Sequence, residues 1–281
     1  MVQFPKIIQI ETSLTCNSHC VFCPHDEMKR EPQLMPDELW KKIIDESRGK
    51  GIIYRPFMVN EPFTDTRLPE IIEYIRKDPT AKVELNSNGN IPVKADIERI
   101  LKAGVDWVRF SIDGFTQETY KKSGRGGTLD KVYADVRRFI ETRNKLGVNC
   151  FVEVRMIDLD VNKHEQEEYV NFWSKYANKA TITALYEWPW SGQETYFPAP
   201  CPKCREEMFF MTNGDAVLCC WDAFGRGVVG NASSESVEEI WLGENMKKHK
   251  DWLNNGDRGK ILLCSKCDAY KTYDFSNWQG Y

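Results

Sequence analysis

The residues that carry the most chemical information are three cysteines near the start of the chain, Cys16, Cys20 and Cys23, in the run Cys-Asn-Ser-His-Cys-Val-Phe-Cys. Three closely spaced thiolates can ligate three irons of a [4Fe–4S] cube and leave the fourth iron open to a small molecule. The alternative is zinc, whose structural sites take four ligands, so that His19 or His25 would have to complete the set. The spacing favours the cube with one open iron.

The Cys-x₃-Cys-x₂-Cys run follows a short apolar strand and resembles the signature of the radical S-adenosylmethionine (SAM) superfamily. The resemblance implies that the open iron chelates SAM and that one electron cleaves its sulfonium. A 5′-deoxyadenosyl radical then abstracts a hydrogen atom from a small-molecule or peptide substrate. A reductant such as flavodoxin or ferredoxin is implied as well. In this family an aromatic residue just before the last cysteine, here Phe22, lies beside the adenine.

Composition narrows the classes of partner. The 281 residues suffice for one large and one small domain, and the net charge is −4 with Lys and Arg spread along the chain. Nucleic-acid-binding proteins carry basic stripes, so no nucleic acid is expected. No apolar run approaches membrane-spanning length, and the first residues lead directly into a strand without a signal peptide. Clustered cysteines then indicate metal ligands in a reducing cytoplasm.

The first two-thirds of the chain alternate strand and helix. Strands are predicted at 7–12, 52–60, 82–86, 107–112, 148–156 and 181–186, and helices at 36–47, 68–76, 93–103, 129–146 and 165–177. Successive β/α units imply a parallel sheet, and six units are fewer than the eight that close a barrel. The sequence therefore predicts an α/β fold, a partial (β/α)₆ TIM-like barrel, with active residues at the carboxyl ends of its strands.

Polar residues follow these strands in order. They are Asn60 and Glu61 after the second strand, Asn88 after the third, Ser111 and Asp113 after the fourth, and Arg125 in Gly124-Arg-Gly-Gly127. The resemblance implies that Asn60 and Glu61 meet the SAM amino group, with Asn60 replacing a usual glycine. It also implies that Asn88 forms the next turn, that Ser111 and Asp113 bond the ribose, and that Arg125 pairs with the SAM carboxylate. Taken singly, each residue fits an ordinary turn equally well.

The alternation stops after about residue 187, so we expect domains at 1–187 and 188–281. Asn213-Gly214 predicts a hairpin between 208–212 and 216–220, and the capping box at 236–239 predicts a short helix. These signals indicate a small C-terminal α+β domain.

Seven further cysteines remain. Cys150 stands apart, and the other six form a second set: Cys201, Cys204, Cys219, Cys220, Cys264 and Cys267. Four thiolates gathered around a hairpin can close a second cube or a zinc site. The segment resembles the SPASM/twitch extensions of radical SAM enzymes, and its length favours the twitch form. The resemblance implies an auxiliary [4Fe–4S] cluster on Cys201, Cys219, Cys264 and Cys267, with Cys204 as the alternative to Cys201. Cys204 and Cys220 are then buried thiols or hydrogen-atom donors.

The fifth strand has a charged face. Glu153 and Arg155 alternate with Val152 and Val154, so the two charged residues face the barrel mouth and Cys150 faces the helices with the valines. We expect Glu153 and Arg155 to contact substrate or SAM, with ion pairing at the strand end as the simpler alternative. Asp222 or Glu153 is the expected base.

The spacing of the second set resembles that of a twitch-type aminocyclitol dehydrogenase, which implies oxidation of an alcohol with the auxiliary cluster as electron acceptor. Val59 and Trp221 stand where that enzyme has substrate contacts, so a different sugar- or cyclitol-like alcohol is expected. Three alternatives remain: a carbohydrate epimerase with Cys204 or Cys220 as hydrogen donor, a peptide-modifying enzyme, and a metal-binding protein without catalysis. Four aromatic residues near the domain junction can stack on substrate or form core: Tyr186, Trp188, Trp190 and Trp221.

Overall fold

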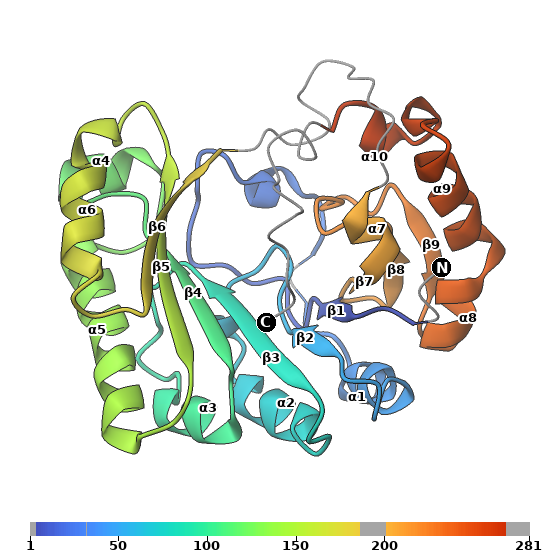
Figure 1. The fold of residues 1–281 in the computed structure, drawn as a ribbon, viewed down its shortest axis with the longest axis horizontal. Coiled ribbons are helices and arrows are strands. Elements are labelled where there is room, and N and C mark those ends of the chain that lie inside the picture. Colours follow the sequence, from blue (N-terminus) through green and yellow to red (C-terminus); the bar gives the residue numbers. More distant parts are fainter. Residues whose placement is uncertain (1–3, 32, 186–200, 268–281) are drawn as a thin grey trace.

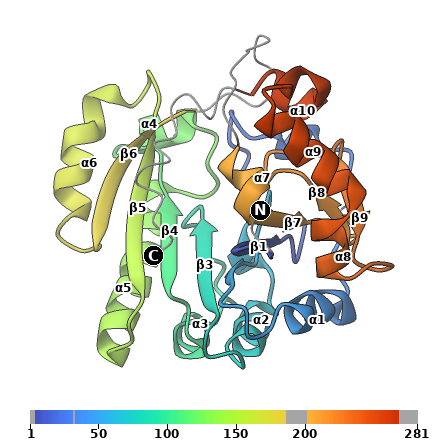
Figure 2. The same cartoon turned by 45° about the vertical axis from the view of Figure 1, so that its right-hand side comes forward.

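The structure is a computed structural model that describes residues 4–31, 33–185 and 201–267. Its centre is one curved sheet of nine strands in the order β6-β5-β4-β3-β2-β1-β7-β8-β9 (Figures 1 and 2). The strands are β1 (Ile7–Ile10), β2 (Ile53–Arg55), β3 (Lys82–Ser87), β4 (Trp107–Ser111), β5 (Phe151–Asp158), β6 (Lys179–Ala184), β7 (Glu207–Phe210), β8 (Asp215–Val217) and β9 (Val228–Asn231).

Helices cover the outer face of this sheet, and the hydrophobic core lies between the two layers (Figure 1). The barrel helices are α1 (Asp37–Glu46), α2 (Leu68–Ile75), α3 (Ile97–Ala103), α4 (Gln117–Lys122), α5 (Leu129–Leu146) and α6 (Gln166–Trp173). The C-terminal helices are α7 (Pro202–Glu206), α8 (Val237–Leu242), α9 (Glu244–Asn254) and α10 (Leu262–Ser265). The short 3₁₀ turns are η1 (Pro24–Glu27), η2 (Pro62–Thr64), η3 (Lys163–Glu165) and η4 (Arg258–Lys260).

The six parallel strands β1 to β6 confirm the predicted partial barrel, which is not closed. The C-terminal part extends this sheet. Strand β7 pairs with β1 in parallel, with Ile7 opposite Glu207 and Ile10 opposite Phe210. The predicted hairpin β7–β8 then continues the sheet as antiparallel strands. The proposed domain boundary at 187/188 lies outside the described residues and stays a prediction.

Element boundaries differ from the predictions where a proline ends a strand or a capping side chain fixes the start of a helix. Strand β2 stops at Arg55 because Pro56 has no N–H to donate to a ladder. Helix α3 begins only at Ile97, since the Asp96 side chain accepts from the Arg99 N–H at 2.9 Å and caps it. The capping box that begins α8 is confirmed: Ser236 and Glu239 bond each other's backbone N–H groups. Helices α4, α7, α9 and α10 and strand β9 were not predicted.

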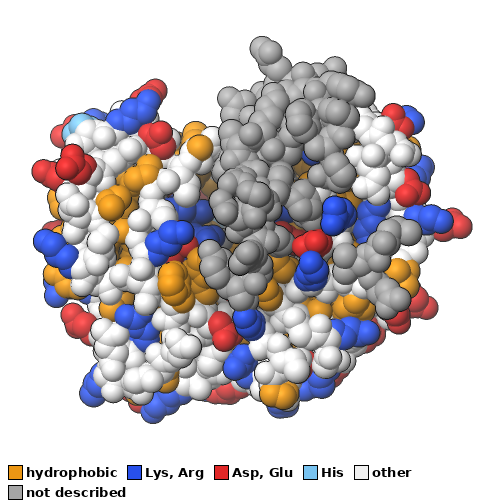
Figure 3. Space-filling view, viewed as in Figure 1, with side chains coloured by type: hydrophobic (Ala, Val, Ile, Leu, Met, Phe, Trp, Pro, Cys, Tyr) orange, Lys and Arg blue, Asp and Glu red, His pale blue; other side chains and the backbone are white. Residues whose placement is uncertain are grey.

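Charged residues of both signs are interspersed over the face of the molecule in Figure 3. This distribution differs from the continuous basic stripe that a nucleic-acid-binding surface would carry. Within the described parts of the chain, the longest apolar helices fall short of what a membrane crossing requires.

Candidate iron–sulfur and cofactor site

The loop that carries Cys16, Cys20 and Cys23 directly follows β1 and is fixed by backbone hydrogen bonds. The N–H of Cys23 donates to the carbonyl of Cys20 at 2.9 Å. The N–H groups of His19 and Val21 donate to the carbonyls of Gly124 at 3.0 Å and Ser123 at 3.1 Å. The cysteine loop is therefore docked on the segment that carries Arg125, more than one hundred residues further along the chain.

The glycines of Gly124-Arg-Gly-Gly127 make this docking possible. A Cβ on Gly126 would stand 1.9 Å from the carbonyl oxygen of Asn17, and one on Gly124 would stand 2.2 Å from that of His19. The Gly126 N–H also donates to the Ser18 hydroxyl at 2.9 Å. No side chain fits at these two positions, so the glycines bring the arginine loop against the cysteine loop.

The three thiols fit a metal cluster by their chemistry. Burial raises the pKa of Cys16 to about 12 and that of Cys23 to about 11, and nearby acidic groups and thiolates add to both shifts. Burial also raises the pKa of Cys20, although the Arg125 charge opposes that shift. Thiolates in this loop therefore need a metal to stabilise them, as the cysteine ligands of a cluster do. In the described residues, no three His, Cys, Asp or Glu side chains already converge on a single-ion site.

Arg125 lies beside the cysteine loop and forms a buried ion pair with Asp113. The Arg125 Nε donates to Asp113 Oδ2 at 2.7 Å, and the guanidinium lies 5.6 Å from the centre of the Phe22 ring. Burial disfavours the charge on Arg125, but Asp113 and Cys20 outweigh it and raise the pKa of Arg125 above its ordinary value. The placement of Arg125 and Phe22 at the cysteines agrees with the predicted roles, which the geometry leaves as proposals.

Asp113 holds Arg125 and β5 together. Its side chain is fully buried, and its second oxygen accepts from the Ile157 N–H at 2.8 Å. Both carboxylate oxygens are thus bonded within the protein, and the predicted contact of Asp113 with the ribose stays a prediction. Ser111 is the more accessible partner, although its hydroxyl already accepts from Arg155 Nη2 at 3.1 Å.

Glu61 is buried beside the end of β3. Its side chain is 2% exposed, and its oxygens accept from the N–H groups of Phe63 at 3.1 Å and Asn88 at 2.6 Å. Burial raises the pKa of Glu61 to about 7. The carboxylate therefore holds the segments after β2 and β3 together, and its role toward SAM stays a prediction.

Asn88 and Asn60, the two asparagines predicted at strand ends, have different hydrogen-bond partners. Asn88 lies against the cysteine loop, where its Nδ2 donates to Asn17 Oδ1 at 2.7 Å and lies 3.9 Å from Cys16 Sγ. Asn60 accepts from the Met58 N–H at 2.8 Å and donates to the Ser13 hydroxyl at 3.2 Å. Asn88 is therefore the predicted strand-end residue closest to the cysteine set by hydrogen bonding.

The inner face of the sheet carries Glu153 and Arg155, as strand alternation predicts. Glu153 accepts from Arg109 Nε at 2.9 Å and from the Thr181 hydroxyl at 2.8 Å. Arg155 reaches Ser111, and its buried Nε has no hydrogen-bond partner among the described residues. Burial and the neighbouring Arg109 charge lower the pKa of Arg155 to about 10. Arg109 was missed, and the same alternation applied to β4 would have placed it here.

Part of the second cysteine set gathers beyond β7. The charges of Cys201, Cys204 and Cys267 all act on the Cys264 thiol, whose pKa burial raises well above its ordinary value. Cys219 lies close to Cys220 and Cys201. The Cys264 thiol is thus coupled to Cys201 and Cys267, and the Cys219 thiol to Cys201, so the ligand set of Cys201, Cys219, Cys264 and Cys267 stays a prediction, with Cys204 as the alternative to Cys201.

Three other predictions concern single residues. Asp222 is 1% exposed and accepts from the N–H groups of Arg226 at 2.8 Å and Gly227 at 2.6 Å, so it shapes the loop after Cys219, and its role as a base stays a prediction. Cys150 is buried in the core among the valines of β5, as predicted. His19 lies at the surface, where Nδ1 is 2.9 Å from Asp26 Oδ1. Tyr186, Trp188 and Trp190 lie outside the described residues.

A buried ion pair, missed from sequence, connects the two parts of the molecule. Arg30, just past the cysteine loop, binds both oxygens of Glu11 at the end of β1. It also donates to the carbonyl of Ala223 at 3.5 Å and to the Thr212 hydroxyl at 3.2 Å. The side chain of Arg30 thus connects the segment after the front cysteines to the loop after Cys220, a contact that cannot be read from the sequence.

A partial barrel with three cysteines after its first strand, and a further cysteine set on the same sheet, defines an iron–sulfur protein of the SAM-binding type. Comparison with known families agrees. The Radical SAM superfamily matches residues 10–172, and the SPASM iron–sulfur cluster-binding domain matches residues 201–268. The chain belongs to the radical SAM superfamily. These two assignments imply a SAM-binding [4Fe–4S] cluster, SAM itself and an auxiliary cluster, as predicted.

Among curated relatives, the probable GTP 3′,8-cyclase of Methanococcus maripaludis is 31% identical over 145 residues, which are 49% of this chain and 48% of the relative. The GTP 3′,8-cyclase of Clostridium perfringens is 26% identical over 172 residues, or 59% and 51% of the two chains. The chain spans about half the length of the curated relatives that it matches.

Solved structures match over nearly the whole chain. BtrN in complex with AdoMet and 2-DOIA is 16% identical with a TM-score of 0.67, covering 95% of this chain and 94% of BtrN. Streptococcus suis SuiB bound to the precursor peptide SuiA is 16% identical with a TM-score of 0.65, covering 94% and 70%. Native anSMEcpe with bound AdoMet is 14% identical with a TM-score of 0.64, covering 93% and 89%. These similarities show a shared fold.

Proposed function

We propose that this radical SAM enzyme abstracts a hydrogen atom from an alcohol of a sugar- or cyclitol-like small molecule and oxidises it to a carbonyl. The bound SAM and its cluster supply the 5′-deoxyadenosyl radical, and the auxiliary cluster takes up the electron that the oxidation releases. The observation that carries the proposal is the joint presence of two cysteine sets on one continuous sheet, with polar side chains on its inner face.

The inner face supplies groups suited to a polar substrate. Arg109 and Glu153 form an ion pair on β4 and β5, and Arg55 pairs with Glu84 at 2.8 Å on β2 and β3. The unpartnered Nε of Arg155 can donate to a hydroxyl or carboxylate oxygen. An apolar substrate would leave the Arg155 Nε without a partner, which costs free energy. The lining therefore favours a substrate rich in hydroxyl groups.

Glu153 is our candidate for the proton acceptor. It lies on the inner face of β5, where Arg109 and Thr181 orient its carboxylate. Asp222, the other predicted base, is engaged by two backbone N–H groups. Removal of the hydroxyl proton from the substrate radical makes that radical a stronger reductant, so a positioned carboxylate favours electron release.

The proposal is tested with anaerobically reconstituted protein, dithionite, SAM and a panel of polyols, aminocyclitols and sugars. A substrate is a compound that raises 5′-deoxyadenosine formation and yields a product lighter by two hydrogens. A product that keeps the mass of the substrate in H₂O and takes up one deuterium in D₂O would instead indicate an epimerase. Turnover only with a peptide would replace the small-molecule proposal, and no 5′-deoxyadenosine with any compound would contradict it altogether.

A further inference from the structure

Helix α9 buries a lysine that has no acidic partner in the described chain. Lys250 is 7% exposed, and its Nζ lies 3.2 Å from the centre of the Trp241 ring and donates to the Trp241 carbonyl at 3.3 Å. Among the residues that the structure describes, no carboxylate forms an ion pair with it. A buried ammonium group is costly unless an anion compensates its charge, so an anion is expected nearby.

Lys250 interacts electrostatically with Cys204 of the second set. Its charge acts on the Cys204 thiol, and the charge of Arg258 acts on both Cys204 and Cys264. Arg258 is 1% exposed and starts the turn that leads to these cysteines. Its carbonyl accepts from the Ile261 N–H at 3.0 Å, and the Ile261 carbonyl accepts from the Cys264 N–H at 2.9 Å. Two buried cations therefore border the place where four thiolates gather.

We propose that Lys250 and Arg258 are the counter-charges of the auxiliary cluster and keep its reduction potential high enough to accept an electron. This inference rests on the proposed function, since it requires that the second cysteine set holds an iron–sulfur cluster. A cube with four thiolate ligands is an anion, and it becomes more negative by one charge on reduction. A fixed cation at its side favours the reduced form, and a low local dielectric strengthens that effect.

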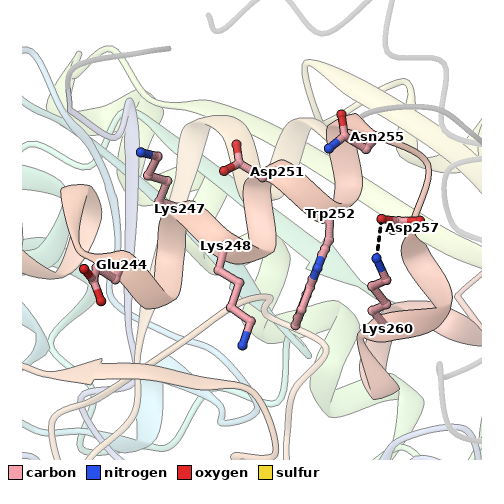
Figure 4. A pocket seen from close by; sticks show the side chains of 8 residues that line it. All are labelled: Glu244, Lys247, Lys248, Asp251, Trp252, Asn255, Asp257 and Lys260. Carbon is pink, nitrogen blue, oxygen red and sulfur yellow. Dashed lines mark hydrogen bonds and ion pairs between the residues drawn. The ribbon is translucent and has the colours of Figure 1, made fainter.

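The same helix offers a matched control. Lys247 lies one turn from Lys250 but is exposed, on the side of α9 that lines the surface hollow in Figure 4 together with Lys248, Trp252 and Lys260. Lys247→Met removes the same charge from the same helix in a setting where water screens it. A general effect of net charge would appear in both variants, whereas a counter-charge effect appears only in Lys250→Met.

The experiment is a potentiometric titration followed by electron paramagnetic resonance on anaerobically reconstituted full-length protein. A parent that carries Cys16→Ala, Cys20→Ala and Cys23→Ala identifies which signal belongs to the auxiliary cluster. We expect Lys250→Met to lower the equilibrium constant for one-electron reduction about tenfold, which corresponds to about 59 mV. Lys247→Met and the charge-retaining Lys250→Arg should keep the potential of the parent.

Iron content separates the possible outcomes. Four irons in the parent with an unchanged potential in Lys250→Met, or equal shifts in Lys250→Met and Lys247→Met, would overturn the inference and leave the proposed function standing. A parent without iron would overturn the auxiliary cluster itself and the inference with it. If Lys250→Met fails to retain iron while Lys250→Arg retains it, the anionic cluster requires the charge, and the inference is supported.

Discussion

Asp113 and Arg125 form a buried ion pair that connects the end of β4 to the loop on which the cysteine loop docks. The Arg125 side chain is 7% exposed, and Asp113 is fully buried. Asp113 also accepts from the backbone of β5, while Arg125 faces the Phe22 ring and the Cys20 thiol. The position of the arginine at the cysteines is therefore set by an aspartate on the barrel.

Asp113→Asn should destabilise the fold and weaken SAM binding together. Removal of one partner leaves the Arg125 charge buried without compensation, which costs about 3–5 kcal/mol. We expect a lower midpoint of chemical unfolding and a higher SAM dissociation constant, both measured anaerobically. Glu118→Gln, which removes an exposed carboxylate nearby, is the control. A variant with the stability and SAM affinity of the wild type would contradict the role of this ion pair.

Cys16→Ala should abolish 5′-deoxyadenosine formation and lower the iron content from about eight to about four atoms per chain. The reason is that two thiolates do not hold the SAM-binding cube. Liquid chromatography after addition of dithionite and SAM measures the cleavage. Cys150→Ala removes a core thiol, so we expect that variant to keep both clusters and SAM cleavage. Cleavage that persists in Cys16→Ala would remove the front cysteines from the mechanism.

Cys264→Ala should spare part of the SAM cleavage but stop product formation. The front cysteines are intact in this variant, whereas the electron from the substrate has no acceptor. The ratio of 5′-deoxyadenosine to product, measured with a substrate identified as above, should rise at least tenfold. An unchanged product yield would favour a redox-neutral reaction over the proposed oxidation.

Gly126→Ala should impair the front cluster without any change of ligand. The added Cβ would meet the Asn17 carbonyl oxygen at 1.9 Å, so the arginine loop has to move away from the cysteine loop. We expect less iron at the front site and slower SAM cleavage. At Gly259 an added Cβ has no neighbour within 4 Å, which makes Gly259→Ala the matched control. Equal iron contents in the two variants would show that the docking is dispensable.

Glu165 should give the protein part of its resistance to acid. Burial opposes its charge, but hydrogen bonds from Thr116, Phe115 and Thr119 outweigh burial and lower the pKa of Glu165 below 4.5. The carboxylate therefore stabilises the fold above pH 4.5, and this contribution is lost as the pH falls through the folded-state pKa.

Glu165→Gln tests this prediction. The variant should lower the free energy of unfolding at pH 7 by about 2 kcal/mol, because hydrogen bonds to a charged acceptor are lost. The difference from wild type, measured side by side by urea unfolding, should shrink below pH 4.5. A difference that stays constant across this range would show that the charge of Glu165 is not responsible.

Alternation of strand and helix was enough to predict the partial barrel, because the hydrophobic pattern of each β/α unit is visible in a short stretch of sequence. Strand parity likewise placed Glu153 and Arg155 on the inner face and Cys150 in the core. The polar residues at the strand ends indicated the region of the candidate site. The burial and hydrogen bonds of each residue there are visible only in the structure. The sequence predicted ligand contacts for Glu61 and Asp113. In the structure, both carboxylate oxygens of each residue accept hydrogen bonds from the protein.

The features that the sequence did not predict are contacts between segments far apart in the chain. A local sequence pattern carries no information about such contacts. The Arg30–Glu11 pair and its bond to Ala223 connect residues nearly two hundred positions apart. Nothing in the sequence gives a reason for the glycines at 124 and 126, which the close contact with Asn17 and His19 explains. Lys250 was missed because a lysine on an amphipathic helix ordinarily faces water.

The pairing of β1 with β7 has a consequence for synthesis of the chain on the ribosome. Ile7 finds its neighbour only when Glu207 has been made, two hundred residues later. Until then one edge of the nascent sheet stays open, and an unpaired edge invites association with other chains. We therefore expect fragments that end before Glu207 to aggregate.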